Sequence, residues 1–329
     1  MKIHTMQYIT LQQTNLTVSR LCLGTMHYGD KQNAMEASTQ LNAFLDYGGT
    51  FIDTAHVYGR WVPNLGSSSE TYIGEWIRKS GKRHHIILST KGCHPALDNR
   101  SVSRVLPENI HSDLSESLAH LQTDYIDLYF LHRDNPSCPV ELIVEALEAE
   151  VQAGRIRYYG CSNWKPERIQ EANAYAHSIG AKGFVVNQAM LSLADISWAG
   201  VEDKTLEAVD RSTLVFQREA HMDLMAYSSI AKGYFSKIFL GEKQRPLDVA
   251  VYGNSSNNRI YQTLKPYLNE FLPIDIELQF LFSFVDPRVV PIVSFSSESQ
   301  LKQGIHAEQL VVPKDLIDKL LVMKTYVQR

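Results

Sequence analysis

The 329-residue sequence has few cysteines, no excess of positive charge and no long apolar run. Its four cysteines lie far apart and form no C-x-x-C pair, which argues against a disulfide framework or a zinc site. Lys and Arg number 32 against 36 Asp and Glu, so neither nucleic acid nor an anionic membrane surface is an expected partner. No apolar run approaches the roughly 18 residues of a membrane span, and the first residues lack the apolar region of a secretory signal. We therefore expect a cytoplasmic protein.

Two familiar phosphate-binding motifs are also missing. The sequence contains no G-x-G-x-x-G, which argues against a Rossmann site. The run Gly24–Gly29 has the glycine spacing of a P-loop, but Asp30 and Lys31 follow it in place of Lys-Ser or Lys-Thr. The scattered histidines lack convergent spacing with acids or cysteines, so no metal site is predicted.

Short β-rich apolar runs alternate along the chain with amphipathic stretches. In the stretch Pro107–Leu121, for example, Ile110, Leu114 and Leu118 recur at helical spacing on one face. Eight strand–helix units in a chain of this size predict an α/β protein with a closed (β/α)8 TIM barrel, formed as a single domain over residues 1–329. The strands are expected at Arg20–Gly24, Thr50–Thr54, His85–Lys91, Tyr125–His132, Ile156–Ser162, Gly183–Gln188, Asp223–Tyr227 and Val289–Val293.

Two segments fall outside the repeating units. Gln7–Ile9 and Leu16–Val18 predict an N-terminal β-hairpin that plugs the bottom of the barrel. The last unit spacing is stretched by residues 232–269, whose Gly, Asn and Ser turns predict a long loop after the seventh strand. Long loops inside compact domains are usually functional or disordered.

Polar side chains lie at the ends of three successive predicted strands: the second ends at Asp53, with Tyr58 five residues on, the third at Lys91 and the fourth at His132. Singly, each has an ordinary explanation, such as a turn cap for Asp53 or a satisfied core histidine for His132. Together they converge on the carboxyl-terminal rim, where barrel enzymes place their active sites.

The chemistry of this set points to carbonyl reduction. A free tyrosine has a pKa near ~10, and a neighbouring ammonium stabilises its phenolate, so we expect Lys91 to lower the pKa of Tyr58. Asp53 would hold Lys91 charged and in place, and His132 would orient a carbonyl or pass the proton. A phenol acid without an obvious nucleophile suits reduction by a hydride that a cofactor supplies.

The motifs around these residues resemble the aldo-keto reductase superfamily in their order along the chain. The resemblance covers roughly residues 20–305 and implies that Asp53, Tyr58, Lys91 and His132 form the catalytic tetrad, with Tyr58 as general acid. The matching segments are Leu23–Met26, Asp53–Gly59, Gly66–Glu70, Ser89–Gly92, Asp124–His132, Gly154–Asn163 and Ala226–Ser228.

The same resemblance implies an NADP or NAD site. Ser162, Asn163 and Gln188 would hold the nicotinamide carboxamide, and Tyr227 would stack on its ring. The segment from Ser228 through Lys232 and Gly233 to Phe235 would wrap the pyrophosphate with backbone N–H groups, and the long loop after it would form a flap.

One departure from the family pattern concerns the stretch after the eighth strand. Members that bind NADP(H) usually carry Lys or Arg there, whereas this chain has no basic residue between Val293 and Lys302. Gln300 is expected near the cofactor, but Glu298 would repel a 2′-phosphate. The sequence therefore leaves both NADP(H) and NAD(H) open.

The function predicted from these residues is reduction of an aldehyde, ketone or sugar carbonyl to the alcohol, or the reverse reaction. Two alternatives remain: a cofactor-binding regulatory subunit with little turnover, and an aldolase that forms a Schiff base on Lys91. Residues that follow strand ends are expected to face the substrate, and their rings and polar groups suit a polyhydroxylated carbonyl compound; they are Met26, His27, Tyr28, His56, Trp61, Cys93, His94, Arg133, Trp164 and Trp198.

Overall fold

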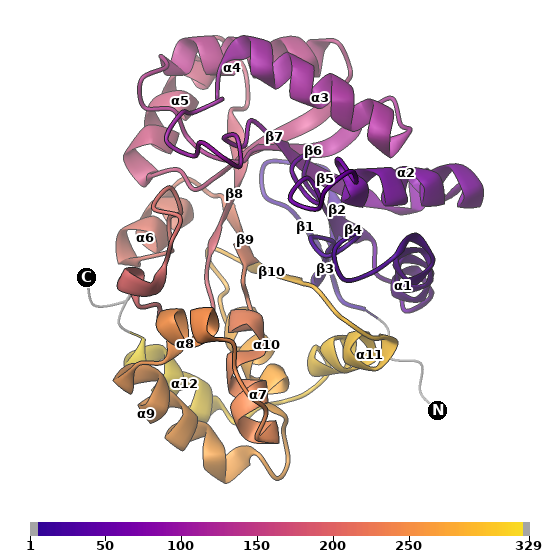
Figure 1. Ribbon diagram of the computed structural model, residues 1–329. Coiled ribbons are helices and arrows are strands. Elements are labelled where there is room, and N and C mark those ends of the chain that lie inside the picture. Colours follow the sequence, from indigo (N-terminus) through magenta and orange to yellow (C-terminus); the bar gives the residue numbers. More distant parts are fainter. Residues whose placement is uncertain (1–5, 325–329) are drawn as a thin grey trace.

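Eight parallel strands close into a barrel in the computed structural model, which describes residues 6–324 (Figure 1). Each strand pairs with its sequence neighbours, and the last strand closes the ring against the first. The predicted barrel is confirmed, with strand boundaries within two residues of those expected from the sequence. The barrel strands are β3 (Cys22–Gly24), β4 (Phe51–Asp53), β5 (Ile87–Gly92), β6 (Ile126–Leu131), β7 (Ile156–Ser162), β8 (Phe184–Met190), β9 (Asp223–Tyr227) and β10 (Val289–Val293).

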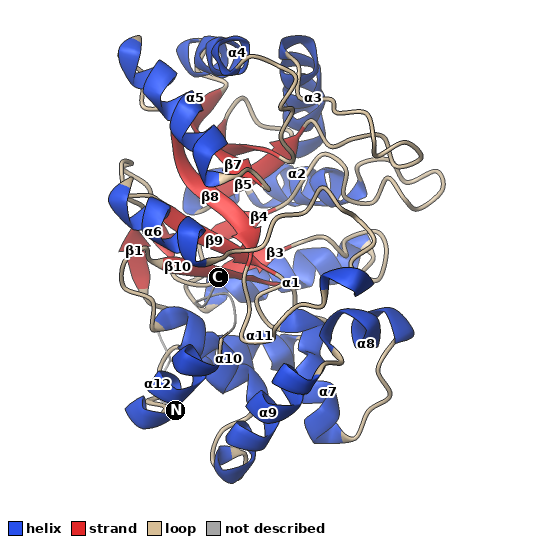
Figure 2. Cartoon of the chain, turned by 90° about the vertical axis from the view of Figure 1, so that its left-hand side faces the viewer, coloured by secondary structure: helices blue, strands red, loops and turns tan. Residues whose placement is uncertain are grey.

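The helices surround the strands, as the second view of the chain shows (Figure 2). Apart from α7, α8 and α9, they lie where the sequence has amphipathic stretches, because a helix with one apolar stripe is stable only when that stripe is covered. The α-helices are α1 (Ala34–Asp46), α2 (Ser68–Ser80), α3 (Pro107–Leu121), α4 (Val140–Gln152), α5 (Pro166–Ser178), α6 (Arg211–Glu219), α7 (Tyr234–Leu240), α8 (Pro246–Tyr252), α9 (Ser255–Leu264), α10 (Pro273–Phe282), α11 (Glu298–Ala307) and α12 (Lys314–Met323).

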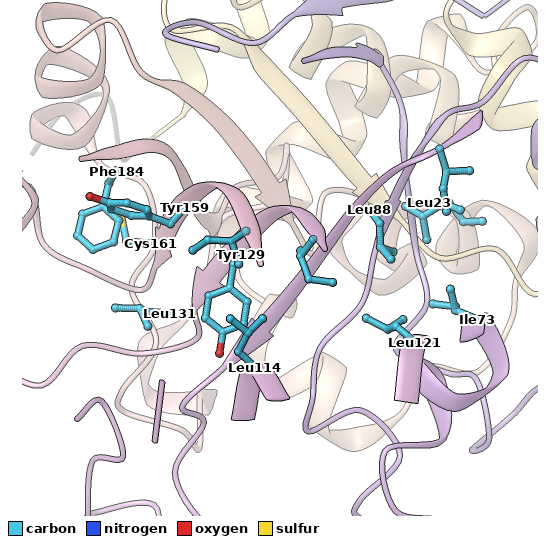
Figure 3. Packing of buried hydrophobic residues seen from close by; sticks show 14 of the residues in the cluster. Leu23, Ile73, Leu88, Leu114, Leu121, Tyr129, Leu131, Tyr159, Cys161 and Phe184 are labelled. Atoms are coloured by element: carbon cyan, nitrogen blue, oxygen red, sulfur yellow. The ribbon is translucent and has the colours of Figure 1, made fainter. Parts of the chain in front are cut away.

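The largest apolar core lies between the strands and the helices outside them. Helix α3 begins with Pro107 at a position where the missing N–H removes no helical hydrogen bond, and it buries Leu114 and Leu121 on one face. These leucines belong to the same buried cluster as Leu88 and Tyr129 of the barrel wall (Figure 3). Burial of this layer holds the strand ends, and thus the residues that follow them, in fixed positions.

An N-terminal hairpin closes the amino-terminal end of the barrel, as predicted. Strand β1 (Tyr8–Thr10) pairs antiparallel with β2 (Thr17–Ser19), one residue later than expected at each strand. Leu11 and Leu16 of its turn are buried in a cluster with residues of the barrel interior such as Phe130. The main-chain N–H of Gln12 donates to Asp223 at the start of β9, which ties the hairpin to that end of the barrel.

The long connection after β9 has more regular structure than the sequence indicated. Residues 232–269 hold the helices α7, α8 and α9 in place of an irregular loop. These helices are short and capped by residues that read as turns in the sequence: Asn254 accepts from the N–H of Asn257 at the start of α9, and Gly241 ends α7 with a positive φ. The turn residues therefore mark helix ends inside the connection.

Residues 6–324 contain neither a membrane-spanning helix nor a cluster of metal ligands. No helix there is long and apolar enough to cross a membrane, and no group of three or more His, Cys, Asp or Glu side chains is arranged to hold a metal ion.

Candidate active site

Asp53 and Lys91 form a buried ion pair at the ends of the adjacent strands β4 and β5. Lys91 Nζ lies 2.6 Å from Asp53 Oδ2, 2.6 Å from the carbonyl oxygen of Thr54 and 3.3 Å from the hydroxyl of Tyr58. The three ammonium hydrogens therefore have three acceptors. Ser89 donates to Asp53 Oδ1 from the same rim, so the carboxylate is held on both oxygens.

Tyr58 lies in the turn that follows β4. Its main-chain N–H donates to the carbonyl oxygen of Ala55, and Gly59 comes next with a φ of +96°. A Cβ at Gly59 would lie 1.9 Å from Ser68 Oγ, and residues with a side chain rarely adopt this φ, so glycine suits the turn. The turn brings the phenol hydroxyl back over Lys91.

The acid–base balance of this group differs from the expectation in one respect. Burial raises the pKa of Tyr58 and outweighs the opposing effect of Lys91, so the predicted net lowering is wrong, although Lys91 acts in the expected direction. Burial lowers the pKa of Lys91, but the attraction of Asp53 and Tyr58 is stronger and raises it. The geometry therefore holds a neutral phenol beside a charged lysine.

His132 follows β6 and faces Tyr58 from the side. The two ring centroids are 6.0 Å apart in an edge-to-face arrangement, and the ring of His94 packs on His132 at 4.8 Å. Burial, with additional repulsion from His94 and Arg133, holds the pKa of His132 well below its usual value. Its imidazole is neutral, and Nδ1 is buried without a partner among the described residues. The structure thus brings all four predicted catalytic residues together.

The residues predicted to hold a nicotinamide lie side by side on the next strands. Ser162 ends β7, Gln188 lies in β8, and Tyr227 ends β9. Gln188 Nε2 donates to Asp53 Oδ1 at 3.0 Å, which links this group to the ion pair. Asn163 is already occupied: its Nδ2 donates to Ser162 Oγ and to the carbonyl oxygen of His132, and its Oδ1 accepts two further bonds.

The segment after β9 turns tightly. Ser228, Ala231, Lys232 and Gly233 all have positive φ values. Tight turns can present main-chain N–H groups to an anion; here the N–H groups of Ala231 and Gly233 donate to the carbonyl oxygens of Ser228 and Ile230. Lys232 Nζ lies 3.9 Å from Asp248, so its charge is shared with a carboxylate of α8.

The stretch after β10 carries its one basic residue in an ion pair. Lys302 Nζ lies 2.7 Å from Glu298 Oε1, one turn earlier in α11, and 5.7 Å from the ring centre of Tyr47. Gln300 Oε1 accepts from the main-chain N–H and the hydroxyl of Ser296, while Ser297 caps the helix. The predicted cofactor residue Gln300 thus orders its own loop.

Part of the expected substrate-facing set is wrong. Tyr28 and Cys93 have no exposed surface, and Trp164 is only 2% exposed. These three side chains therefore pack beneath the loops and do not face the substrate. Met26 and Trp61 are the exposed members, at 38% and 40%, and the Trp61 indole meets the Tyr58 ring edge-to-face at 6.2 Å. Burial of a residue after a strand depends on the loop that covers it, which the sequence pattern did not reveal.

Comparison with known proteins identifies the family. The model of the Aldo/keto reductase family matches residues 20–321. The chain belongs to this family. It is 33% identical over 233 residues to the uncharacterized oxidoreductase YrpG of Bacillus subtilis, covering 69% of this chain and 68% of the relative. It is 26% identical over 323 residues to the aryl-alcohol dehydrogenase GME11368 of Pestalotiopsis microspora, covering 93% and 79%. Norsolorinic acid reductase B of Dothistroma septosporum is 28% identical over 257 residues, covering 74% and 61%.

An aldo-keto reductase of this kind is an NAD(P)-dependent oxidoreductase. The residues present fit such a cofactor by the chemistry of their side chains. The hydroxyl of Ser162 and the amide of Gln188, which makes one hydrogen bond among the described residues, match the donors and acceptors of a carboxamide. The ring of Tyr227 ends the adjacent strand, half-buried, in reach of a flat heterocycle.

Proposed function

We propose that the protein reduces an aldehyde, ketone or sugar carbonyl to the alcohol with NADPH or NADH, and that Tyr58 is the general acid. The observation that carries this proposal is the position of Lys91, whose Nζ contacts both Asp53 Oδ2 at 2.6 Å and the Tyr58 hydroxyl at 3.3 Å. A buried ammonium beside a phenol has a direct use where the phenol must give up its proton.

Each residue of the group has a separate task in this reaction. A nicotinamide supplies the hydride when it is bound. Tyr58 donates its proton to the carbonyl oxygen as negative charge develops there. Lys91 stabilises the phenolate that remains, and Asp53 holds Lys91 charged and oriented. Because the imidazole of His132 is neutral, it orients the carbonyl and does not compete with Tyr58 for the role of acid.

Ser162 and Gln188 would hold the carboxamide of the nicotinamide and Tyr227 would stack on its ring, while Asn163 orients the Tyr227 hydroxyl. Lys232 and the turn that contains Ser228 and Gly233 would hold the pyrophosphate through main-chain N–H groups. Gln300 shapes the loop that would meet the adenosine. Because Lys302 is paired with Glu298, the described stretch from Val293 to Lys302 holds no unpaired cation for a 2′-phosphate, so the proposal includes both NADPH and NADH.

The aldolase alternative conflicts with the state of Lys91. A Schiff base needs a neutral amine, whereas Asp53 and Tyr58 raise the pKa of Lys91 and all three of its hydrogens are in use. A measurement of turnover distinguishes the regulatory-subunit alternative, which predicts cofactor binding with little turnover, from the enzyme.

Substitution of the proposed acid tests the function. Tyr58→Phe should lower kcat by at least about 10²-fold, because it removes the proton donor, and should leave cofactor affinity within about threefold. Tyr72→Phe, a half-buried tyrosine of α2, is the matched control and should keep normal turnover. Normal turnover in Tyr58→Phe would reject Tyr58 as the acid. A wild-type protein that binds NADPH yet reduces no member of a panel of sugars and simple aldehydes would reject the enzyme proposal itself.

A further inference from the structure

Arg133, the residue after His132, is buried, and its guanidinium makes three hydrogen bonds. It is 6% exposed. Its Nη1 donates to the carbonyl oxygen of His132 at 2.7 Å, its Nε to the hydroxyl of Thr205 at 2.7 Å and its Nη2 to Asp203 Oδ2 at 2.9 Å. None of the predicted catalytic roles uses this guanidinium.

Asp203 and Thr205 belong to the connection between β8 and α6, residues 191–210, which we call the β8–α6 loop. Arg100, from the connection after β5, also approaches Asp203, at 3.9 Å. Hydrogen bonds from Thr205 and Arg133 outweigh the burial of Asp203 and lower its pKa to about 2, so it is ionised at neutral pH. Three loops of the barrel rim thus meet at one carboxylate.

Glu207, two residues after Thr205 in the β8–α6 loop, contacts Asn163, one of the residues predicted to hold the nicotinamide. The main-chain N–H of Glu207 donates to Asn163 Oδ1 at 3.0 Å, and the Tyr227 hydroxyl donates to the same oxygen at 2.6 Å. Asn163 Nδ2 donates in turn to the carbonyl oxygen of His132 at 3.2 Å. That carbonyl also accepts from Arg133, so the hydrogen bonds form a closed circuit from His132 through Arg133, the β8–α6 loop and Asn163 back to His132.

The circuit determines what each member can do. An amide side chain has two N–H donors and an oxygen with two lone pairs, and in Asn163 all four are taken by protein groups. Asn163 is held with a φ of +62°, in the left-handed region. Its orientation, and that of the Tyr227 hydroxyl, depends on where the β8–α6 loop places Glu207.

We propose that the Arg133–Asp203 ion pair is a latch that fixes the β8–α6 loop and thereby positions His132 on the substrate side and the Asn163–Tyr227 pair on the cofactor side together. Arg133 and Asp203 are positioning residues, and the inference rests on the proposed function for the meaning of those two sides. Because one loop sets both, loss of the latch should weaken cofactor binding and slow hydride transfer in the same variant.

The test compares Asp203→Asn and Arg133→Met with Glu202→Gln, a change of an exposed neighbouring carboxylate to its amide. NADPH and NADH dissociation constants are measured by quenching of protein fluorescence, and kcat with its deuterium isotope effect is measured with cofactor labelled at the transferred position. Asp203→Asn should weaken cofactor binding about tenfold, lower kcat about tenfold and increase the isotope effect, as expected for coupling of this size. Glu202→Gln should match the wild type in all three.

Two further variants separate a latch from a general packing role. Arg133→Lys keeps the charge but lacks the planar fork, so it should fall between wild type and Arg133→Met. The double variant Arg133→Met/Asp203→Asn should be no worse than Arg133→Met alone, because both changes break one interaction. Additive losses in the double variant would overturn the latch.

The outcomes for the latch and for the proposed function are distinguishable. A folded Asp203→Asn protein with wild-type cofactor affinity and kcat overturns the latch and leaves the proposed function intact. A wild type without turnover rejects the proposed function, and the cofactor dissociation constants then decide the latch alone. If Arg133→Met does not fold, Asp203→Asn and Thr205→Val, both at the loop side of the pair, carry the same comparison.

Discussion

Lys91 Nζ lies 2.6 Å from Asp53 Oδ2, with both side chains at most 3% exposed. Two opposite charges in such a place stabilise the protein only together, since either one alone would be a buried charge without its partner. The pair therefore serves the fold and the reaction through the same contact, and substitution of one member should affect both.

Asp53→Asn should lower kcat at least about 10²-fold and the free energy of unfolding by about 3 kcal/mol, because Lys91 loses the charge that holds it. Steady-state kinetics and urea denaturation measure the two effects. Asp127→Asn is the matched control: Asp127 is equally buried, 2.8 Å from Arg83 in the barrel wall, and should lose stability with little change in kcat. Equal loss of kcat in both variants would show that the effect at Asp53 is only structural.

The rate of carbonyl reduction should not change with pH between about pH 6 and 9. Burial raises the pKa of Tyr58, so the acid stays protonated throughout this range, and His132 stays neutral because its pKa is held low. Alcohol oxidation needs the phenolate and should become faster as the pH rises. Rates of the two directions, measured from pH 5 to 10 at saturating substrate, check this. A fall in the reduction rate centred near pH 8 would contradict it.

Glu298→Gln should favour NADPH. The change removes a negative charge and releases Lys302, whose ammonium then becomes available to a 2′-phosphate. NADPH affinity should rise about three- to tenfold at low ionic strength, with the gain shrinking in 0.5 M salt, while NADH affinity stays constant. Asp315→Asn breaks an ion pair of the same spacing with Lys319 in α12 and should change neither affinity. An equal rise in affinity for NADPH and NADH would show that the change does not act through the 2′-phosphate.

Glu308→Gln should stabilise the protein at alkaline pH. Burial raises the pKa of Glu308 to about 7, and its Oε2 accepts from the main-chain N–H of Gln7. A carboxyl group whose pKa is raised on folding weakens the fold as the pH rises from its unfolded value towards the folded one. The variant should therefore nearly equal the wild type around pH 4.5 and gain on the order of 3 kcal/mol by pH 8 in urea denaturation. Exposed Glu270→Gln should show no such pH-dependent gain.

The barrel and the catalytic group were predictable because both follow from local patterns. Strand–helix alternation is visible in runs such as Ile156–Ser162 and Pro107–Leu121, whose observed boundaries equal the expected ones. Asp53 and Lys91 lie at the carboxyl-terminal ends of their strands and His132 directly follows its strand, and parallel strands in a barrel bring these ends to one rim.

The features that sequence reasoning missed depend on contacts between distant segments. Arg133 meets Asp203 seventy residues away, in a loop without a periodic pattern, so nothing local indicates the partner. The net pKa shift of Tyr58 depends on how much water its neighbours exclude, a property of packing around the turn. Asn163 was identified from the resemblance, but its full set of hydrogen bonds involves Glu207, forty-four residues later.

The N-terminal hairpin has a kinetic consequence. Leu11 and Leu16 pack into the amino-terminal end of the barrel, and apolar side chains such as Phe130 fill the interior, so the site that contains Tyr58 is open towards the opposite rim. If, as proposed, the cofactor lies against Gln188 and Tyr227 beneath the substrate, it must arrive before the substrate, and the alcohol must leave before the oxidised cofactor can. Turnover should follow a compulsory order, with the last dissociation step setting its pace for good substrates.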